Sequence, residues 1–174
     1  MSGFVLFATP WWVNLLILIP VAPYLLSRKN KLRVGKKRLL VVALFAVAFG
    51  FVEAAVVVYL RAATGLWPGP PLKALVLPAP LLRIESFREA ATIVMLGVIA
   101  LLAGQRAKEK FISFLWTFAL WDLSYYIWMR LTIGWPASFL NTDVLFLIPV
   151  LWLAQVWFPI LVSGLTALVI WLRD

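Results

Sequence analysis

The sequence predicts an all-α polytopic membrane protein, a bundle of five transmembrane helices that forms a single domain over residues 1–174. Three observations predict this fold. Hydrophobic residues make up 64% of the chain and charged residues only 13%, with a mean hydropathy of +1.00, unlike a soluble domain. Apolar stretches recur at lengths close to the ~20 residues that a helix needs to cross a bilayer. Basic residues gather between these stretches, as they do in the loops of membrane proteins.

Each apolar stretch is read as one spanning helix. The third is the shortest, and the fifth is long enough to tilt or to bend at Pro149 or Pro159. The segment between the second and third contains five prolines and a hydrophobic middle, which favours an anchor on the membrane surface over a lid across the bundle. The predicted helices cover residues 9–27, 39–62, 87–104, 111–133 and 144–172, and the extracytoplasmic proline-rich loop covers 63–86.

The basic residues predict the orientation. Residues 27–38, "SRKNKLRVGKKR", contain seven lysines and arginines, and residues 105–110, "QRAKEK", contain three. Positively charged loops stay in the cytoplasm, so the N-terminus is expected outside and the C-terminus inside, in a bacterial inner membrane. Since these loops account for most of the net charge of +9, the expected partner is the lipid bilayer and not nucleic acid.

Missing residue types exclude several chemistries. The chain has no cysteine and no histidine, which disfavours haem, zinc and thiolate metal sites and removes the common catalytic triads. A calcium or magnesium site would need about six or more oxygen ligands, and only a few acids are candidates. We therefore predict neither a metal site nor a cofactor.

Two acids lie near the middle of predicted spanning helices, where they can neither cap a helix end nor reach water. Glu53 and Asp122 each cost on the order of 3 kcal/mol at that depth, so each should face protein or water and find a partner. Tyr125 and Tyr126 share a helical face with Asp122, and Gln155 could reach the same depth. The sequence predicts a buried polar centre in which Glu53 and Asp122 share a proton.

Further polar residues are expected on the outward path from this centre, although each also has a structural explanation. Glu89 can form a capping box with Ser86, and an acid in the first turn of the fifth helix is favoured by the helix dipole. Arginines at the outer helix ends can extend to the interface. The candidates are Arg61, Arg88, Glu89, Arg130 and Asp143. Glu85 and Thr92 lie on the same helical face as Glu89.

Four segments carry a resemblance: "FVEAAVVVYLR", "ESFREAATIVML", "WDLSYYIWMRLTIGWP" and "DVLFLIPV". From about Glu53 to the end of the last helix, the chain resembles a group of small, uncharacterised bacterial integral membrane proteins with five helices. The resemblance implies the membrane class and carries no activity.

Three functions fit these observations. The favoured one is a non-catalytic component of a membrane assembly, in which the polar centre fixes the packing against partner subunits or a second copy. The second is an outward-opening binding or transport protein for a small anionic molecule or lipid headgroup, coupled to protons through Glu53 and Asp122. The third is an intramembrane enzyme acting on a lipid or isoprenoid, which the lack of a catalytic motif disfavours. A cavity reaching Glu53 would favour the second or third function over the first.

Overall fold

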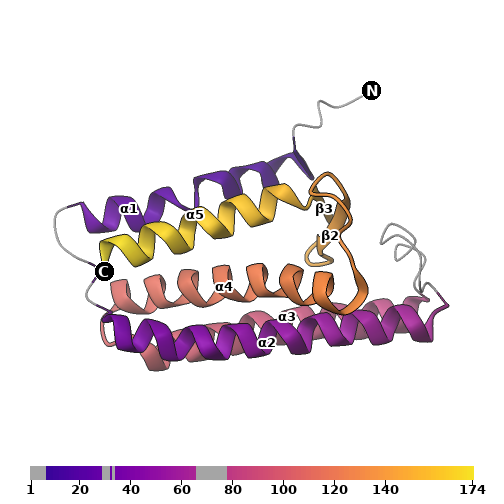
Figure 1. The fold of residues 1–174 in the computed structure, drawn as a ribbon, viewed down its shortest axis with the longest axis horizontal. Coiled ribbons are helices and arrows are strands. Elements are labelled where there is room, and N and C mark those ends of the chain that lie inside the picture. The colour runs from indigo at the N-terminus through magenta and orange to yellow at the C-terminus, as the bar shows by residue number, and fades with distance from the viewer. Residues whose placement is uncertain (1–6, 29–31, 33, 66–77) are drawn as a thin grey trace.

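The computed structural model describes residues 7–28, 32, 34–65 and 78–174, and it is mostly helical with a small sheet at one end (Figure 1). A 3₁₀ helix, η1 (Trp11–Leu18), leads into the short helix α1. The α-helices are α1 (Val21–Ser27), α2 (Lys36–Ala63), α3 (Ala79–Ala103), α4 (Ala107–Ile133) and α5 (Trp157–Arg173). The strands are β1 (Ala8–Thr9), β2 (Thr142–Phe146) and β3 (Trp152–Gln155), which pair antiparallel in the order β1-β3-β2.

Helix α4 organises the bundle, because α2, α3 and α5 all pack against it. The approach of α2 is close at Gly50, where an added Cβ would lie 2.9 Å from the carbonyl oxygen of Trp121 and collide with the hydroxyl of Ser124. The indole of Trp116 also donates a hydrogen bond of 2.8 Å to the carbonyl of Leu39 across this interface. The two helices that carry Glu53 and Asp122 are therefore direct neighbours.

The end of the bundle with the basic segments is closed by an apolar core and by the C-terminal residue. Leu39, Ile112 and Ile170 are fully buried there. The side chain of Asp174 accepts hydrogen bonds from the backbone N–H groups of Val34 (2.6 Å) and Gly35 (3.0 Å). This contact fixes the start of α2 beside the end of α5.

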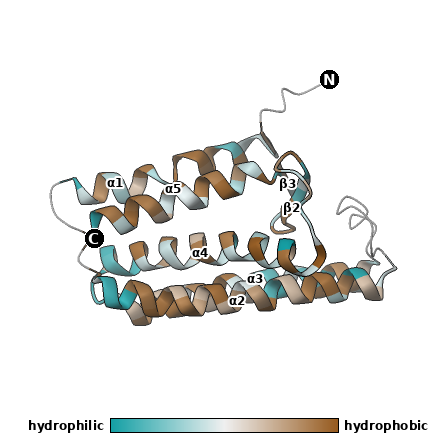
Figure 2. Cartoon of the chain, viewed as in Figure 1, coloured by the Kyte–Doolittle hydropathy of each residue, from teal (hydrophilic) through white to brown (hydrophobic). Residues whose placement is uncertain are grey.

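Among the described residues, two helices, α2 and α3, are long and apolar enough by length and composition to cross a membrane. In the most apolar 18-residue stretch of each helix, 28% of α2 and 22% of α3 is buried. A core helix of a soluble protein is mostly buried. Figure 2 shows the hydrophobic colour along most of α2 and the hydrophilic colour at its start, near the C-terminus.

The predicted helix 9–27 is wrong as a single element. The segment is divided into β1, η1 and α1, with Pro20 between the last two. Proline lacks a backbone N–H and disrupts a continuous α-helix, which accounts for the break.

The predicted start of the third helix at residue 87 is also wrong, because α3 begins at Ala79. Pro80 lies in the first turn, where proline is tolerated since no intrahelical N–H bond is lost. Ser86 is therefore inside the helix, and its hydroxyl donates to the carbonyl of Leu82 (2.9 Å) and does not form the predicted capping box. Residues 79–86 of the predicted proline-rich loop are helical, and its residues 66–77 lie outside the described residues.

The largest correction concerns the predicted helix 144–172. Its first part forms the hairpin of β2 and β3, and α5 begins only at Trp157. Pro149 lies between the two strands, and strand pairing joins Val144 to Leu153 and Phe146 to Trp152. Asp143 is thus a strand residue and not the first turn of a helix, and the fold is mostly but not entirely helical.

Candidate functional site

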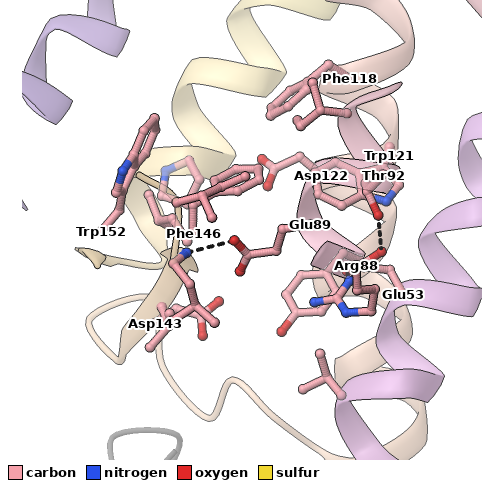
Figure 3. Close-up of a pocket in the computed structure, with 18 of the residues that line it drawn as sticks. Glu53, Arg88, Glu89, Thr92, Phe118, Trp121, Asp122, Asp143, Phe146 and Trp152 are labelled. Carbon is pink, nitrogen blue, oxygen red and sulfur yellow. Dashed lines mark hydrogen bonds and ion pairs between the residues drawn. The ribbon is translucent and has the colours of Figure 1, made fainter. Parts of the chain in front are cut away.

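A cavity of about 850 Å³ lies where α2, α3, α4, α5 and the β2–β3 hairpin meet. Most of its wall is apolar, and the polar side chains of the predicted centre project from several elements at once (Figure 3). Eight of the ten predicted site residues line it. They are Glu53, Arg61, Arg88, Glu89, Asp122, Tyr125, Tyr126 and Asp143.

Arg88 on α3 is the centre of an ion-pair cluster. Its guanidinium contacts the carboxylate of Glu53 on α2 and donates two hydrogen bonds to Glu85 Oε1, from Nε (2.9 Å) and Nη2 (2.5 Å). The hydroxyl of Thr92 donates a further hydrogen bond of 3.2 Å to Glu53 Oε2. The side chains of Glu53 and Arg88 are 9% and 22% exposed, so the pair is largely withdrawn from solvent. Glu53 therefore has its compensating charge on the neighbouring helix.

The spacing along α3 explains why these groups meet. Glu85, Arg88, Glu89 and Thr92 follow one another at three and four residues, which places them on one helical face. Because α3 packs against α4 and α2, this face is turned toward the cavity. The alignment of Glu85, Glu89 and Thr92 that the sequence indicated is present in the structure.

Glu89 and Asp143 connect the helices to the hairpin. The carboxylate of Glu89 accepts a hydrogen bond of 2.8 Å from the backbone N–H of Leu147. The hydroxyl of Tyr126 donates one of 3.0 Å to Asp143 Oδ2. Asp143 lies on β2, outside the long helices, and is only 4% exposed. This burial raises the pKa of Asp143 to about 7. The hydrogen bond from Tyr126 and the charge of Arg61 act in the opposite direction and lower the pKa.

The predicted proton-sharing contact between Glu53 and Asp122 is not present. Asp122 instead accepts a hydrogen bond of 2.7 Å from the hydroxyl of Ser163 on α5, while Glu53 faces Arg88. Both acids line the same cavity, but on different parts of its wall (Figure 3). The adjacency of α2 and α4 was therefore sufficient to bring both acids to one cavity but not to pair them.

Arg61, near the end of α2, does not extend to the interface as expected. It is only 6% exposed, and its guanidinium lies 5.2 Å from the ring centroid of Trp135. Among the described residues it makes no ion pair within 4.0 Å. A cation over an aromatic face is stabilised without a carboxylate contact, which explains how this arginine is retained in the wall.

Aromatic rings form a continuous part of the wall. Phe118 lies 5.3 Å from Trp121 and 6.3 Å from Phe146, and Phe146 lies 5.4 Å from Trp152, between ring centroids. The indole nitrogens of Trp121 and Trp152 are buried and have no hydrogen-bond partner among the described residues. A buried indole N–H normally finds an acceptor, so the wall contains unused donors.

Gln155 and Arg130 are not part of this site. The side-chain oxygen of Gln155, on β3, accepts a hydrogen bond of 2.8 Å from the indole of Trp157. Arg130 donates to the carbonyls of Gly134 (2.6 Å) and Pro136 (2.9 Å) and satisfies the end of α4. Neither residue lines the cavity, and their predicted binding role stays a prediction.

The sequence reasoning missed two contributors. Ser163 is an unremarkable serine in an apolar helix, and its role depends on how α5 packs against α4. The backbone N–H of Leu147 is available only because the segment forms a hairpin. A polar residue inside an otherwise apolar stretch was the only sequence signal for Ser163. No sequence signal indicated Leu147.

The carboxyl groups are distributed around the cavity wall. Within residues 7–28, 32, 34–65 and 78–174, no three acidic side chains are close enough to hold a metal ion together.

No protein-family model matches the chain, and neither a curated protein nor a solved structure matches it significantly. The resemblance to small bacterial membrane proteins therefore stays a prediction, and the function must be argued from the geometry of the cavity.

Proposed function

We propose that the protein is a multi-pass protein of a bacterial inner membrane that binds or transports a small, mainly apolar molecule in the cavity beside Glu53. In this proposal all five helical segments cross or enter the bilayer, with the N-terminus outside and the C-terminus in the cytoplasm. The observation that carries the proposal is the cavity itself. Its volume of about 850 Å³ is within the range of small-molecule sites, and its wall is apolar with a few polar groups.

Membrane placement is supported by the outward surfaces of the helices. Large apolar side chains are exposed on four different helices: Leu44 is 73% exposed, Leu102 is 78%, Leu131 is 70% and Leu172 is 71%. Apolar surface on all sides is costly in water and favourable in lipid.

The cavity favours a binding function over the role of a non-catalytic subunit that the sequence favoured. A purely structural polar contact between helices needs no empty space beside it, and packed interiors contain few voids larger than water. Here the polar groups surround a space large enough for an organic molecule. The subunit role stays a prediction, and the enzyme role has no reacting group to support it beyond general acids.

The proposal is tested by titrating 1-aminoanthracene, a neutral fluorescent molecule, into the protein in lipid nanodiscs. We expect saturable binding at one site per chain. A cavity-filling substitution, Val57→Trp, should weaken binding at least tenfold, since Val57 lines the cavity. The matched control is Val98→Trp on the exposed side of α3, where Val98 is 48% exposed, and it should bind as the wild type does.

Two outcomes would refute the binding function. The first is the absence of saturable binding to the wild-type protein. The second is equal binding by the Val57→Trp and Val98→Trp proteins when both retain the wild-type unfolding temperature, because the probe would then be outside the cavity.

A further inference from the structure

The charges around the cavity are strongly unequal. The chain has seven acidic residues, and five of them line the cavity: Glu53, Glu85, Glu89, Asp122 and Asp143. The described part of the wall carries two arginines, Arg61 and Arg88. If all the carboxyl groups were ionised, three negative charges would be left without a compensating cation.

Three of these carboxyl groups have only neutral hydrogen-bond donors as direct partners. Glu89 accepts from a backbone N–H, Asp122 from a serine hydroxyl and Asp143 from a tyrosine hydroxyl. Among the described residues that line the cavity, the ion pairs within 4.0 Å are those of Arg88 with Glu53 and Glu85. Neutral donors orient a carboxylate but leave its charge in place, and an unpaired charge away from water is costly. Each of these groups must therefore take up a proton or face a cation.

The rest of the wall indicates what kind of cation would fit. The acids of the described residues do not converge on one point, so they do not suit a small metal ion. The rings of Phe118, Trp121, Phe146 and Trp152 contact one another in sequence, and all four residues line the cavity (Figure 3). Aromatic faces attract cations and also contact apolar groups, so they favour an organic cation with apolar substituents.

Trp121 is only 7% exposed, and its indole N–H has no acceptor among the described residues. An unpaired buried donor needs an acceptor atom, so it indicates a ligand that carries a hydrogen-bond acceptor in addition to its cationic centre. Arg61, already counted among the two cations, lies over Trp135, and its charge acts on Asp143. The side of the cavity with Glu89 and Asp122 keeps its negative excess.

We infer that the molecule bound in this cavity is a lipophilic organic cation, such as a substituted amine, quaternary ammonium or phosphonium compound. This inference rests on the proposed binding function and specifies its ligand. It assigns a charge opposite to the anionic ligand that the sequence suggested, because the arginines at the cavity are outnumbered by carboxylates. Bound cation and bound protons are then alternative ways to neutralise the same carboxyl groups.

Two probes of nearly identical shape and opposite charge test this inference. Tetraphenylphosphonium and tetraphenylborate both carry four phenyl groups around a central atom. The wild-type protein in phosphatidylcholine nanodiscs should bind tetraphenylphosphonium at least tenfold more tightly than tetraphenylborate in equilibrium dialysis, after subtraction of binding to empty nanodiscs. Equal affinity, tighter binding of the anion, or no binding of either probe overturns the inference.

Variants locate the effect. Glu89→Gln and Asp122→Asn, on different helices, should each lower the affinity for tetraphenylphosphonium about tenfold. Glu109→Gln, which removes an acid outside the cavity, should leave it unchanged. Unchanged affinity in both cavity variants overturns the inference. If one of the two variants does not unfold cooperatively, the test relies on the other variant alone.

The two proposals fail in different ways. If 1-aminoanthracene binds and Val57→Trp blocks it, but the two charged probes bind equally, the cavity is a binding site without a preference for cations. If no probe binds, the binding function fails as well.

Discussion

Replacement of Arg88 by leucine gives the sharpest test of the site's electrostatics. Arg88 contacts Glu53 and donates two hydrogen bonds to Glu85, and the side chains of these acids are only 9% and 10% exposed. Removal of one partner from a buried ion pair leaves an uncompensated charge and typically costs about 3–5 kcal/mol. Since the side chain of Arg88 is 22% exposed, we expect a loss near the lower end, about 3 kcal/mol.

The assay is reversible unfolding in mixed micelles titrated with SDS, which gives a free energy of unfolding. Arg83→Leu is the matched control, because Arg83 is an exposed arginine on the same helix and should change stability by less than about 0.5 kcal/mol. The double variant Arg88→Leu/Glu53→Gln should recover a substantial part of the loss, since the uncompensated charge on Glu53 is gone. The reasoning is refuted if Arg88→Leu is as stable as Arg83→Leu, or if the double variant recovers nothing.

Two further predictions concern stability. Gly50→Ala should destabilise the protein by about 1–3 kcal/mol in the same assay, because its Cβ would collide with Ser124 and the backbone of α4. The control is Gly97→Ala, where a Cβ meets no atom within 4 Å, and it should be neutral or slightly stabilising. Equal effects of the two substitutions would contradict the close packing at Gly50. The pKa of Asp143 is raised to about 7 from 3.8, so the folded state holds a proton between these values that the unfolded state releases, and stability should fall as pH rises from about 4 to 7. The contribution of Asp143 to the free energy of unfolding over this range is at most about 4 kcal/mol. Asp143→Asn should flatten this part of the pH profile, measured by thermal unfolding. An unchanged slope in the variant would show that Asp143 does not titrate there.

Local sequence patterns predicted α2 and α4 well. The apolar stretch around Glu53 and the stretch around Asp122 are both helical over nearly the predicted ranges, since length and continuous hydrophobicity leave few alternatives. The acids also reached a common cavity, because a carboxylate in the middle of an apolar helix has few places to go except toward other polar groups.

The hairpin could not be predicted in the same way. Residues 144–154 are apolar, and a short apolar run is compatible with a helix or with buried strands. The choice of strands depends on pairing with β1, which comes from the other end of the chain, with Ala8 opposite Ala154. Such a long-range partner is invisible to a local pattern, and it moved Asp143 from a helix start to the cavity wall.

The sequence by itself determined that the chain is highly apolar, that it forms long helices with basic segments between them, and that it contains a few acids requiring partners. The tertiary structure alone decided those partners: Arg88 for Glu53, Ser163 for Asp122 and Tyr126 for Asp143. The physical reason is that hydrophobicity and helix propensity act along the chain, whereas an ion pair or hydrogen bond needs atoms within a few ångströms. Those distances are set by how α2, α3 and α5 pack around α4.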